Sequence, residues 1–122
     1  MTTIKYKTLF CDIDGTLFVY RKFETYKTTV PQPIPSVIEK ITSLFDTGHC
    51  VVLTTARPES LRELTMKELK MYDIPYNQLV MGLARGTRYL INDKEDDSID
   101  RAISINVSRN VGFTVNDLKQ FD

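Results

Sequence analysis

Apolar residues follow two patterns along the chain, short continuous runs and longer stretches with helical spacing. The runs Tyr6–Cys11 and Cys50–Thr54 are rich in strand-favouring residues, and the second is continuous enough for a strand buried on both faces. Ser36–Phe45 and Pro58–Tyr72 repeat their apolar residues three and four positions apart, which predicts helices. Three further short runs predict a third, a fourth and a fifth strand: Gln78–Met81, Arg88–Ile91 and Ala102–Val107.

Polar and turn-forming residues suggest where these elements begin and end. Ser36 with Glu39 predicts a capping box for the first helix, and Gly48 a stop after it. Asn116 is a candidate cap for a short last helix. The segment from Leu17 to Val30 is aromatic and polar without a helical period, and we expect a short hairpin or flap there.

The alternation of strands and helices predicts an α/β fold. We expect a three-layer Rossmann-like domain over residues 1–122, built on a central, mostly parallel sheet. Ligands of such sheets bind beyond the carboxyl ends of the strands. The unusual polar residues fall at these predicted ends: Asp12 and Asp14, Thr54 to Arg57, and Asn92 to Lys94.

Composition narrows the class of protein. With 122 residues, 42% of them hydrophobic, and a formal net charge of +0, the chain suits one folded domain. It has no overall charge to attract nucleic acid or anionic membrane, although a local basic patch stays open. We expect no membrane span, no secretory signal at the N-terminus and a cytoplasmic location, with Cys11 and Cys50 favoured as free thiols.

The acidic motif Asp12-Ile13-Asp14-Gly15-Thr16 carries the chemistry. Two close carboxylates are costly unless a cation neutralises them or one holds a proton. Mg²⁺ prefers oxygen ligands and binds through few carboxylates together with substrate phosphate. An Asx-turn is the structural alternative, because Asp-Gly is a common turn dipeptide. The apolar strand before the motif and Thr16-Leu17 behind it favour a functional site.

The segment Cys11–Leu17 resembles the first motif of the haloacid dehalogenase-like superfamily of phosphohydrolases, residue for residue. The resemblance implies that Asp12 is the nucleophile and forms an aspartyl-phosphate. Asp14 would protonate the leaving oxygen and then activate water, while its backbone carbonyl ligates Mg²⁺. The short spacing between Leu17 and Pro35 leaves room for a small flap but not for a cap domain, as in capless members.

The second motif of that family is similar to Thr54-Thr55-Ala56-Arg57-Pro58. The resemblance implies that the Thr55 hydroxyl donates to a phosphoryl oxygen and that Arg57 contacts phosphate or substrate. Thr54 is the alternative to Thr55 if the register differs by one residue, and Gly15 is placed with the substrate-binding residues. A helix cap at Thr55 with a solvated Arg57 is the purely structural interpretation.

The other two family motifs match less closely. Asn92-Asp93 resembles the acidic pair of the fourth motif, which makes Asp93 the expected metal ligand beside Asp12 and Asp14, with Asp97 as a further acid. The third motif usually supplies a lysine that offsets negative charge, and no lysine lies between Leu79 and Leu90. The candidates that replace it are Lys94 and Arg85, and the sequence does not decide between them.

The expected function is therefore Mg²⁺-dependent hydrolysis of a phosphomonoester. The substrate is a phosphorylated small molecule or macromolecule, for instance a sugar phosphate or a nucleotide or nucleic-acid phosphate. The alternative is a catalytically weak domain that binds or regulates. A receiver domain is disfavoured, because its phosphorylated Asp follows the third strand and Asp12 follows the first. Four aromatic residues of the flap can stack on a base or pack a hairpin: Phe18, Tyr20, Phe23 and Tyr26.

Overall fold

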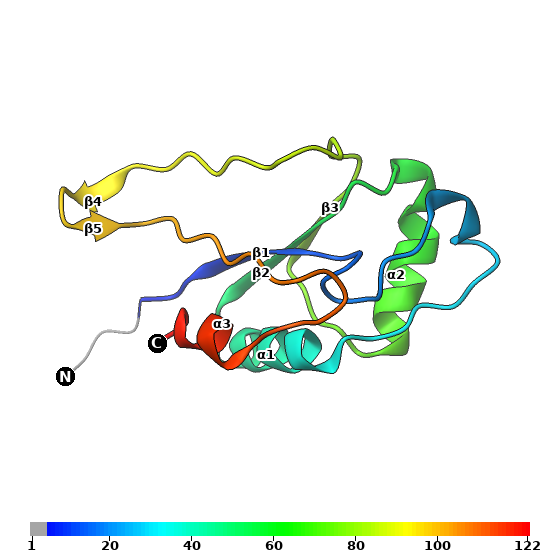
Figure 1. Cartoon of the computed structure of the whole chain (residues 1–122), viewed down its shortest axis with the longest axis horizontal. Helices are drawn as coiled ribbons and strands as arrows, with labels where there is room; N and C mark the ends of the chain where they lie inside the picture. Colours follow the sequence, from blue (N-terminus) through cyan, green and yellow to red (C-terminus); the bar gives the residue numbers. More distant parts are fainter. Residues whose placement is uncertain (1–4) are drawn as a thin grey trace.

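A small parallel sheet forms the centre of the computed structural model, which describes residues 5–122 (Figure 1). The expectation that no secretory signal is present rests mainly on residues 1–4, which lie outside the described residues. Within residues 5–122, no helix is long and apolar enough to cross a membrane. The elements are β1 (Thr8–Asp12), η1 (Phe23–Thr25), α1 (Pro35–Asp46), β2 (Cys50–Thr54), η2 (Glu59–Leu61), α2 (Arg62–Met71), β3 (Gln78–Val80), β4 (Lys94–Asp96), β5 (Ile99–Asp100) and α3 (Val115–Lys119).

The three strands β1, β2 and β3 are parallel and lie in that order. Asp12 lies opposite Thr54, and Thr54 lies opposite Val80. The carboxyl ends of the three strands are therefore level with one another, and residues that follow them emerge at one edge. The α/β class, the parallel sheet and the first three predicted strands are confirmed.

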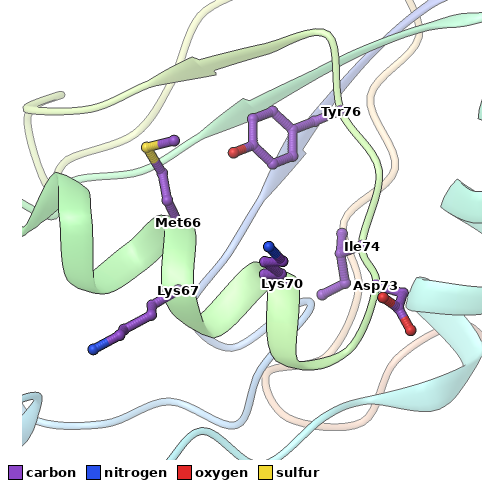
Figure 2. A pocket seen from close by; sticks show the side chains of 6 residues that line it. All are labelled: Met66, Lys67, Lys70, Asp73, Ile74 and Tyr76. Atoms are coloured by element: carbon purple, nitrogen blue, oxygen red, sulfur yellow. The ribbon is translucent and has the colours of Figure 1, made fainter.

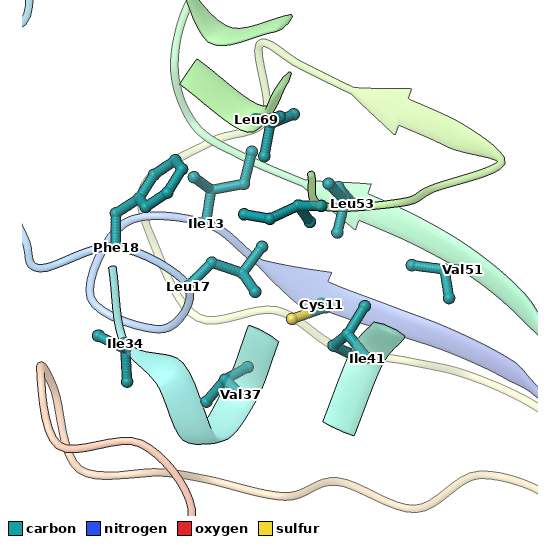
Figure 3. Close-up of a cluster of buried hydrophobic side chains, with 11 residues drawn as sticks. Cys11, Ile13, Leu17, Phe18, Ile34, Val37, Ile41, Val51, Leu53 and Leu69 are labelled. Atoms are coloured by element: carbon teal, nitrogen blue, oxygen red, sulfur yellow. The ribbon is translucent and has the colours of Figure 1, made fainter. Parts of the chain in front are cut away.

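Both long helices pack on the same face of the sheet (Figure 3). Val37 and Ile41 of α1 and Leu69 of α2 belong to one buried cluster with strand residues Cys11 and Leu53. Successive strand side chains alternate between faces, so Phe10 and Val80 point to the opposite face. There Phe10 is 58% exposed and Val80 is 37% exposed, although Val52 between them is buried.

The first helix begins differently from the predicted capping box. Ile34 is its N-cap without a side-chain hydrogen bond, and Pro35 occupies the first turn. The hydroxyl of Ser36 instead accepts a hydrogen bond from the backbone N–H of Phe113, 3.0 Å away, which attaches the C-terminal segment to α1. The stop at Gly48 is confirmed, because this glycine follows the helix with a φ of 103°.

Two other local predictions are wrong. Of the two forms expected after Leu17, a hairpin or a flap, the hairpin does not form: the segment holds the single 3₁₀ turn η1, with Phe18 fully buried in the main cluster and Tyr26 buried in a second one. The last helix is capped by Thr114, which forms a capping box with Asp117, and Asn116 lies inside the helix.

The predicted fourth and fifth strands, Arg88–Ile91 and Ala102–Val107, are also wrong. Residues 83–108, which we call the arm, run away from the sheet and return to it (Figure 1). Their strands are β4 and β5, an antiparallel hairpin at the far end. Every residue from 84 to 101 is exposed. Neither of the two apolar runs forms a strand or joins β1–β3.

Candidate active site

The acidic motif turns sharply because its apolar residues are anchored in the core. Ile13 and Leu17 are fully buried (Figure 3), and the carbonyl of Ile13 accepts from the N–H groups of both Leu17 and Phe18. Gly15 has a φ of +88°, a conformation that side-chain-bearing residues rarely adopt. Its missing Cβ also leaves space for Arg109, whose Cγ lies 3.1 Å from where that Cβ would be. This turn leaves Asp12 and Asp14 at the carboxyl edge.

Asp12 is the accessible carboxylate of the pair, with 34% of its side chain exposed. Its Oδ1 accepts a hydrogen bond from Nη1 of Arg88 at 3.1 Å, and its Oδ2 accepts from the hydroxyl of Thr16 at 3.3 Å. The neighbouring thiol of Cys11 is buried; burial, and secondly the charge of Asp12, raises its pKa to about 12. Cys11 is therefore not a nucleophile at neutral pH, whereas Asp12 has both charge and access.

Asp14 is held by a buried arginine. Nη2 of Arg57 donates to Oδ1 at 2.8 Å and Nε donates to Oδ2 at 2.9 Å, a bidentate pair, and the Tyr26 hydroxyl adds a third bond at 2.9 Å. The Arg57 side chain is 0% exposed. In this structure the buried Arg57 side chain positions Asp14, and the contact with phosphate or substrate that the second motif implies for Arg57 stays a prediction.

Arg21 of the flap and Glu68, which sequence reasoning missed, complete this network. Glu68 of α2 accepts from Nη1 of Arg57 at 2.9 Å and from Nη2 of Arg21 at 2.6 Å. The guanidinium groups of Arg57 and Arg21 also lie over the Tyr26 ring, 4.4 and 4.9 Å from its centroid. A glutamate on the apolar stripe of a predicted helix, as Glu68 is, was the available signal, since a buried charge requires a partner.

The pKa values of this network follow from its burial and charges. Burial alone lowers the pKa of Arg57, but hydrogen bonds and charge attraction from Asp14 and Glu68 outweigh it and raise the pKa above its ordinary value. Burial, and then the charge of Asp14 and the hydrogen bond to it, raises the pKa of Tyr26 to about 12. Tyr26 is therefore a neutral hydrogen-bond donor at all ordinary working pH values.

The two threonines after β2 differ in access. Thr54 is half-buried and lies opposite Asp12 in the parallel register, so both side chains point to the same face. Thr55 is buried, its N–H bonds the carbonyl of Val80, and its Oγ1 accepts from the N–H of Arg57 at 3.0 Å. The structure thus uses Thr55 to shape the turn that points Arg57 inward, and Thr54 is the threonine opposite Asp12.

The predicted residues of the arm are not brought to Asp12. Asp93 pairs with Arg101 at 3.1 Å, and Lys94 pairs with Asp100 at 3.7 Å. Asp97 lies exposed in the hairpin turn. No group of three His, Cys, Asp or Glu residues that could hold a metal ion occurs within residues 5–122. The metal-binding roles of Asp93 and Asp97 stay predictions.

The cation that offsets the negative charge of Asp12 in the structure is neither Lys94 nor Arg85 but a third residue, Arg88. The Arg85 guanidinium lies 5.8 Å from the ring centroid of Phe23, and Lys94 is engaged in the hairpin. Arg88 is the cation that contacts Asp12. It had no strong sequence signal, because it stands at the start of a run predicted to be a strand.

The residues at this edge offer oxygen ligands that suit Mg²⁺. Within the described chain, the backbone carbonyl of Asp14 accepts no hydrogen bond, and it lies two residues from the exposed carboxylate of Asp12. One carboxylate and one carbonyl, completed by water and substrate phosphate, is a donor set that Mg²⁺ accepts. Because the carboxylate of Asp14 is occupied by Arg57 and Tyr26, we expect its carbonyl rather than its side chain to be the ligand.

A pocket elsewhere on the molecule does not belong to this site. Figure 2 shows it between α2 and the segment that leads into β3, lined by Met66, Lys67, Lys70, Asp73, Ile74 and Tyr76. The segment precedes β3, so the pocket lies toward the amino ends of the strands, at the opposite edge of the sheet from Asp12.

Comparison with known proteins identifies the family. A search of the curated proteins finds no match. Among solved structures, one protein from the "Pnkp1/Rnl/Hen1 complex" is similar, with a TM-score of 0.57 and 24% identity. The match covers 73% of this chain but only 32% of that protein, so this chain spans about a third of its length. A Vibrio cholerae protein is similar with a TM-score of 0.53 and 18% identity, covering 93% of this chain and 94% of that one. These two similarities show the fold. The sequence pattern of the haloacid dehalogenase-like hydrolases matches residues 9–119, and the chain therefore belongs to that family.

Proposed function

We propose that this hydrolase is a Mg²⁺-dependent phosphomonoesterase with Asp12 as its nucleophile. The observation that carries the proposal is the contrast between the two acids of the motif. The carboxylate of Asp12 is partly exposed at the carboxyl edge, at 34%, and lies beside the cation Arg88, whereas that of Asp14 is only 12% exposed and held by Arg57. One acid is free to attack, and the other is positioned next to it.

The reaction would proceed in two displacements. In the first, an oxygen of Asp12 bonds to phosphorus, the ester P–O bond breaks, and Asp14, which must first release Arg57 and take up a proton, gives that proton to the leaving oxygen. In the second, the Asp14 carboxylate takes a proton from water, the water oxygen bonds to phosphorus, and the bond from Asp12 to phosphorus breaks. Phosphate leaves, and both carboxyl groups return to their starting states.

The remaining residues would bind and orient the phosphate. Arg88 offsets the negative charge next to Asp12, and Thr54 presents its side chain on the same face as the nucleophile. Asp12 and the carbonyl of Asp14 would hold Mg²⁺, with Asp93 as the predicted third ligand. The bound ion would neutralise charge on the phosphoryl oxygens. Arg57 and Tyr26 keep Asp14 in place until it exchanges a proton.

The substrate class follows from the open edge. Residues 5–122 contain no separate cap domain over Asp12, and the exposed side chain of Tyr20 lies under the Arg109 guanidinium, 4.5 Å from ring centroid to carbon. A phosphorylated sugar, a nucleotide and the phosphorylated end of a nucleic acid are the candidates.

The experiment is Mg²⁺-dependent hydrolysis of an aryl phosphate, followed by a panel of phosphorylated sugars, nucleotides and oligonucleotide ends. We expect Asp12→Asn to lower kcat by a factor on the order of 10⁴ or more, as removal of a nucleophile does in other covalent enzymes. Asp46→Asn, an exposed acid at the end of α1, is the matched control and should keep full activity. Hydrolysis that survives Asp12→Asn unchanged means that the nucleophile is another residue. No hydrolysis by the unmodified chain on the whole panel favours the binding or regulatory domain.

A further inference from the structure

Strand β1 has one edge without a neighbouring strand, and the arm contains an apolar run without a strand partner. Strand β1 pairs only with β2 within the described chain, so its second edge is open. The run Arg88–Ile91 has no backbone–backbone hydrogen bond in residues 5–122. Within it Tyr89 is 85% exposed and Ile91 is 92% exposed. Open strand edges and exposed strand-forming segments are the features that join separate chains by strand addition.

The chain cannot pair this run with its own β1 in the parallel direction. A parallel crossover needs a dozen or more residues. Only seven residues, 81–87, separate the end of β3 from Arg88. This connection is therefore too short to carry the run Arg88–Ile91 back to the amino edge of the sheet, where a strand parallel to β1 would have to begin.

The observed path runs the other way and carries Asp93 away from the site. Arg88 contacts Asp12 at the carboxyl end of β1, while Glu95 contacts Lys5, before its amino end, at 3.5 Å. The outgoing half of the arm is thus antiparallel to β1 (Figure 1). In this direction Asp93 pairs with Arg101 and does not reach Asp12 of its own chain.

We propose that two copies of this chain exchange their arms about a twofold axis, so that each copy supplies Asp93 to the site of the other. A twofold axis perpendicular to the arm reverses its direction. The run Arg88–Ile91 of the second copy would then lie parallel to β1 and end with its Asp93 beside Asp12. The proposal deepens the proposed function, since it gives that site its missing acid, and it rests on that function.

The exposed apolar residues fit this arrangement. The uncovered face of the sheet exposes Phe10 and Val80, and the arm exposes Tyr89, Leu90 and Ile91. Parallel sheets are normally covered on both faces, and here one face has its helices while the other has none over Phe10 within the described residues. In a twofold interface every contact occurs twice, so the sheet face of each copy would be covered by the arm of the other.

The first test is the mass of the particle in solution, measured by sedimentation equilibrium. We expect twice the 14.1 kDa of one chain. Ile91→Glu should reduce the mass to that of one chain without loss of helical circular dichroism, because this side chain touches little in its own copy. The control, Lys70→Glu on the exposed surface of α2, should leave the mass unchanged. A single-chain mass for the unmodified protein overturns the proposal and means that the arm folds only on its own copy.

The second test separates exchange of arms from simple association. Asp12→Asn and Asp93→Asn chains should each be inactive alone. When they are co-expressed, a mixed pair has one site with both acids intact, so about a quarter of all sites recover. If Asp93 serves its own chain, no site recovers and the proposal is wrong. The control is a double variant, Asp12→Asn with Asp93→Asn, co-expressed with the unmodified chain, whose mixed pairs contain no fully intact site.

Calorimetric titration with Mg²⁺ gives a readout that does not depend on hydrolysis. Mg²⁺ sites should be weakened in each single variant and recovered in the mixture at about a quarter of the unmodified number, by the same symmetry. If the unmodified chain hydrolyses no phosphate but the mixture recovers Mg²⁺ sites, the proposed function fails and the exchange of arms stands. If hydrolysis is found in the unmodified chain and the mixture recovers neither activity nor Mg²⁺ sites, the exchange fails and the function stands.

Discussion

The body of the molecule, residues 5–82, and the arm, residues 83–108, both contain apolar runs and ion pairs. These are more deeply buried in the body than in the arm. In the body, apolar runs become β1, β2 and β3, and the charged groups of Arg57, Asp14 and Glu68 are buried with partners. In the arm, an equally apolar run is exposed and its ion pairs lie in solvent. The difference teaches that an apolar run specifies an extended strand only where the chain can bring a second strand to it.

The largest difference should appear when an ion pair is broken in each region. Arg57→Ala leaves Asp14 and Glu68 buried without their cation, which costs about 3–5 kcal/mol of unfolding free energy. Arg101→Ala removes a pair whose side chains are 54% and 71% exposed, and exposed pairs contribute about 0–1 kcal/mol. Urea unfolding measures both. Equal losses would contradict the contrast between body and arm.

The same comparison can be made with two isoleucines. Ile41 is 2% exposed in the main cluster, and Ile41→Ala should cost about 2–5 kcal/mol because it leaves a cavity. Ile91→Ala, at a position 92% exposed, should change the unfolding free energy of a single copy by less than about 0.5 kcal/mol. Urea unfolding at a protein concentration low enough to separate copies is the measurement. A large loss for Ile91→Ala under these conditions would show that the arm packs on its own chain.

A smaller effect is expected from the hydroxyl of Tyr26. Tyr26→Phe removes its hydrogen bond to Asp14 and should cost about 1.5–3 kcal/mol, the range for bonds to charged groups. The pKa of Tyr26 is raised from its ordinary value of 10 to about 12, so the folded chain holds this proton more tightly than the unfolded chain. The contribution is complete below pH 10 and is lost as pH rises through 12. Unfolding curves at pH 8 and pH 11 should therefore show a smaller difference between Tyr26→Phe and the unmodified chain at pH 11. Tyr20→Phe, at an exposed ring, is the control.

The smallest effect concerns the two free thiols. Cys11 is buried and its pKa is raised to about 12, whereas Cys50 is half-buried. At pH 8 a thiol reagent should modify Cys50 first and Cys11 only after unfolding. Mass spectrometry of the labelled native chain identifies the site. Rapid modification of Cys11 would mean that the cluster around the motif opens readily.

Much of the body could be predicted from the sequence because its signals are local. The Asp-Gly turn, the continuous run of β2 and the apolar spacing of α1 each specify structure within a few residues. Two of the failures involve partners distant in the sequence. Ser36 is used by Phe113 instead of capping its own helix, and Arg57 turns inward because Asp14 and Glu68 surround it. Nothing within a few residues of Ser36 or Arg57 indicates those contacts.

The arm shows a second kind of limit. The apolar run Arg88–Ile91 has the composition of a strand, and Asp93 after it resembles the acid of the fourth family motif. The short connection from β3, which decides where this run can go, is visible in the sequence but has meaning only once the strand order is known. For the same reason Arg88, and neither Lys94 nor Arg85, is the cation found beside Asp12.

The central claim is that Asp12 accepts the phosphoryl group, and binding of beryllofluoride tests it most directly. Beryllofluoride mimics a phosphoryl group bonded to a carboxylate. Fluorine NMR of the unmodified chain with Mg²⁺ and beryllofluoride should show bound resonances that vanish with Asp12→Asn and persist with Asp46→Asn. Bound resonances that are unchanged in Asp12→Asn would contradict the account, because the acceptor would then be another residue.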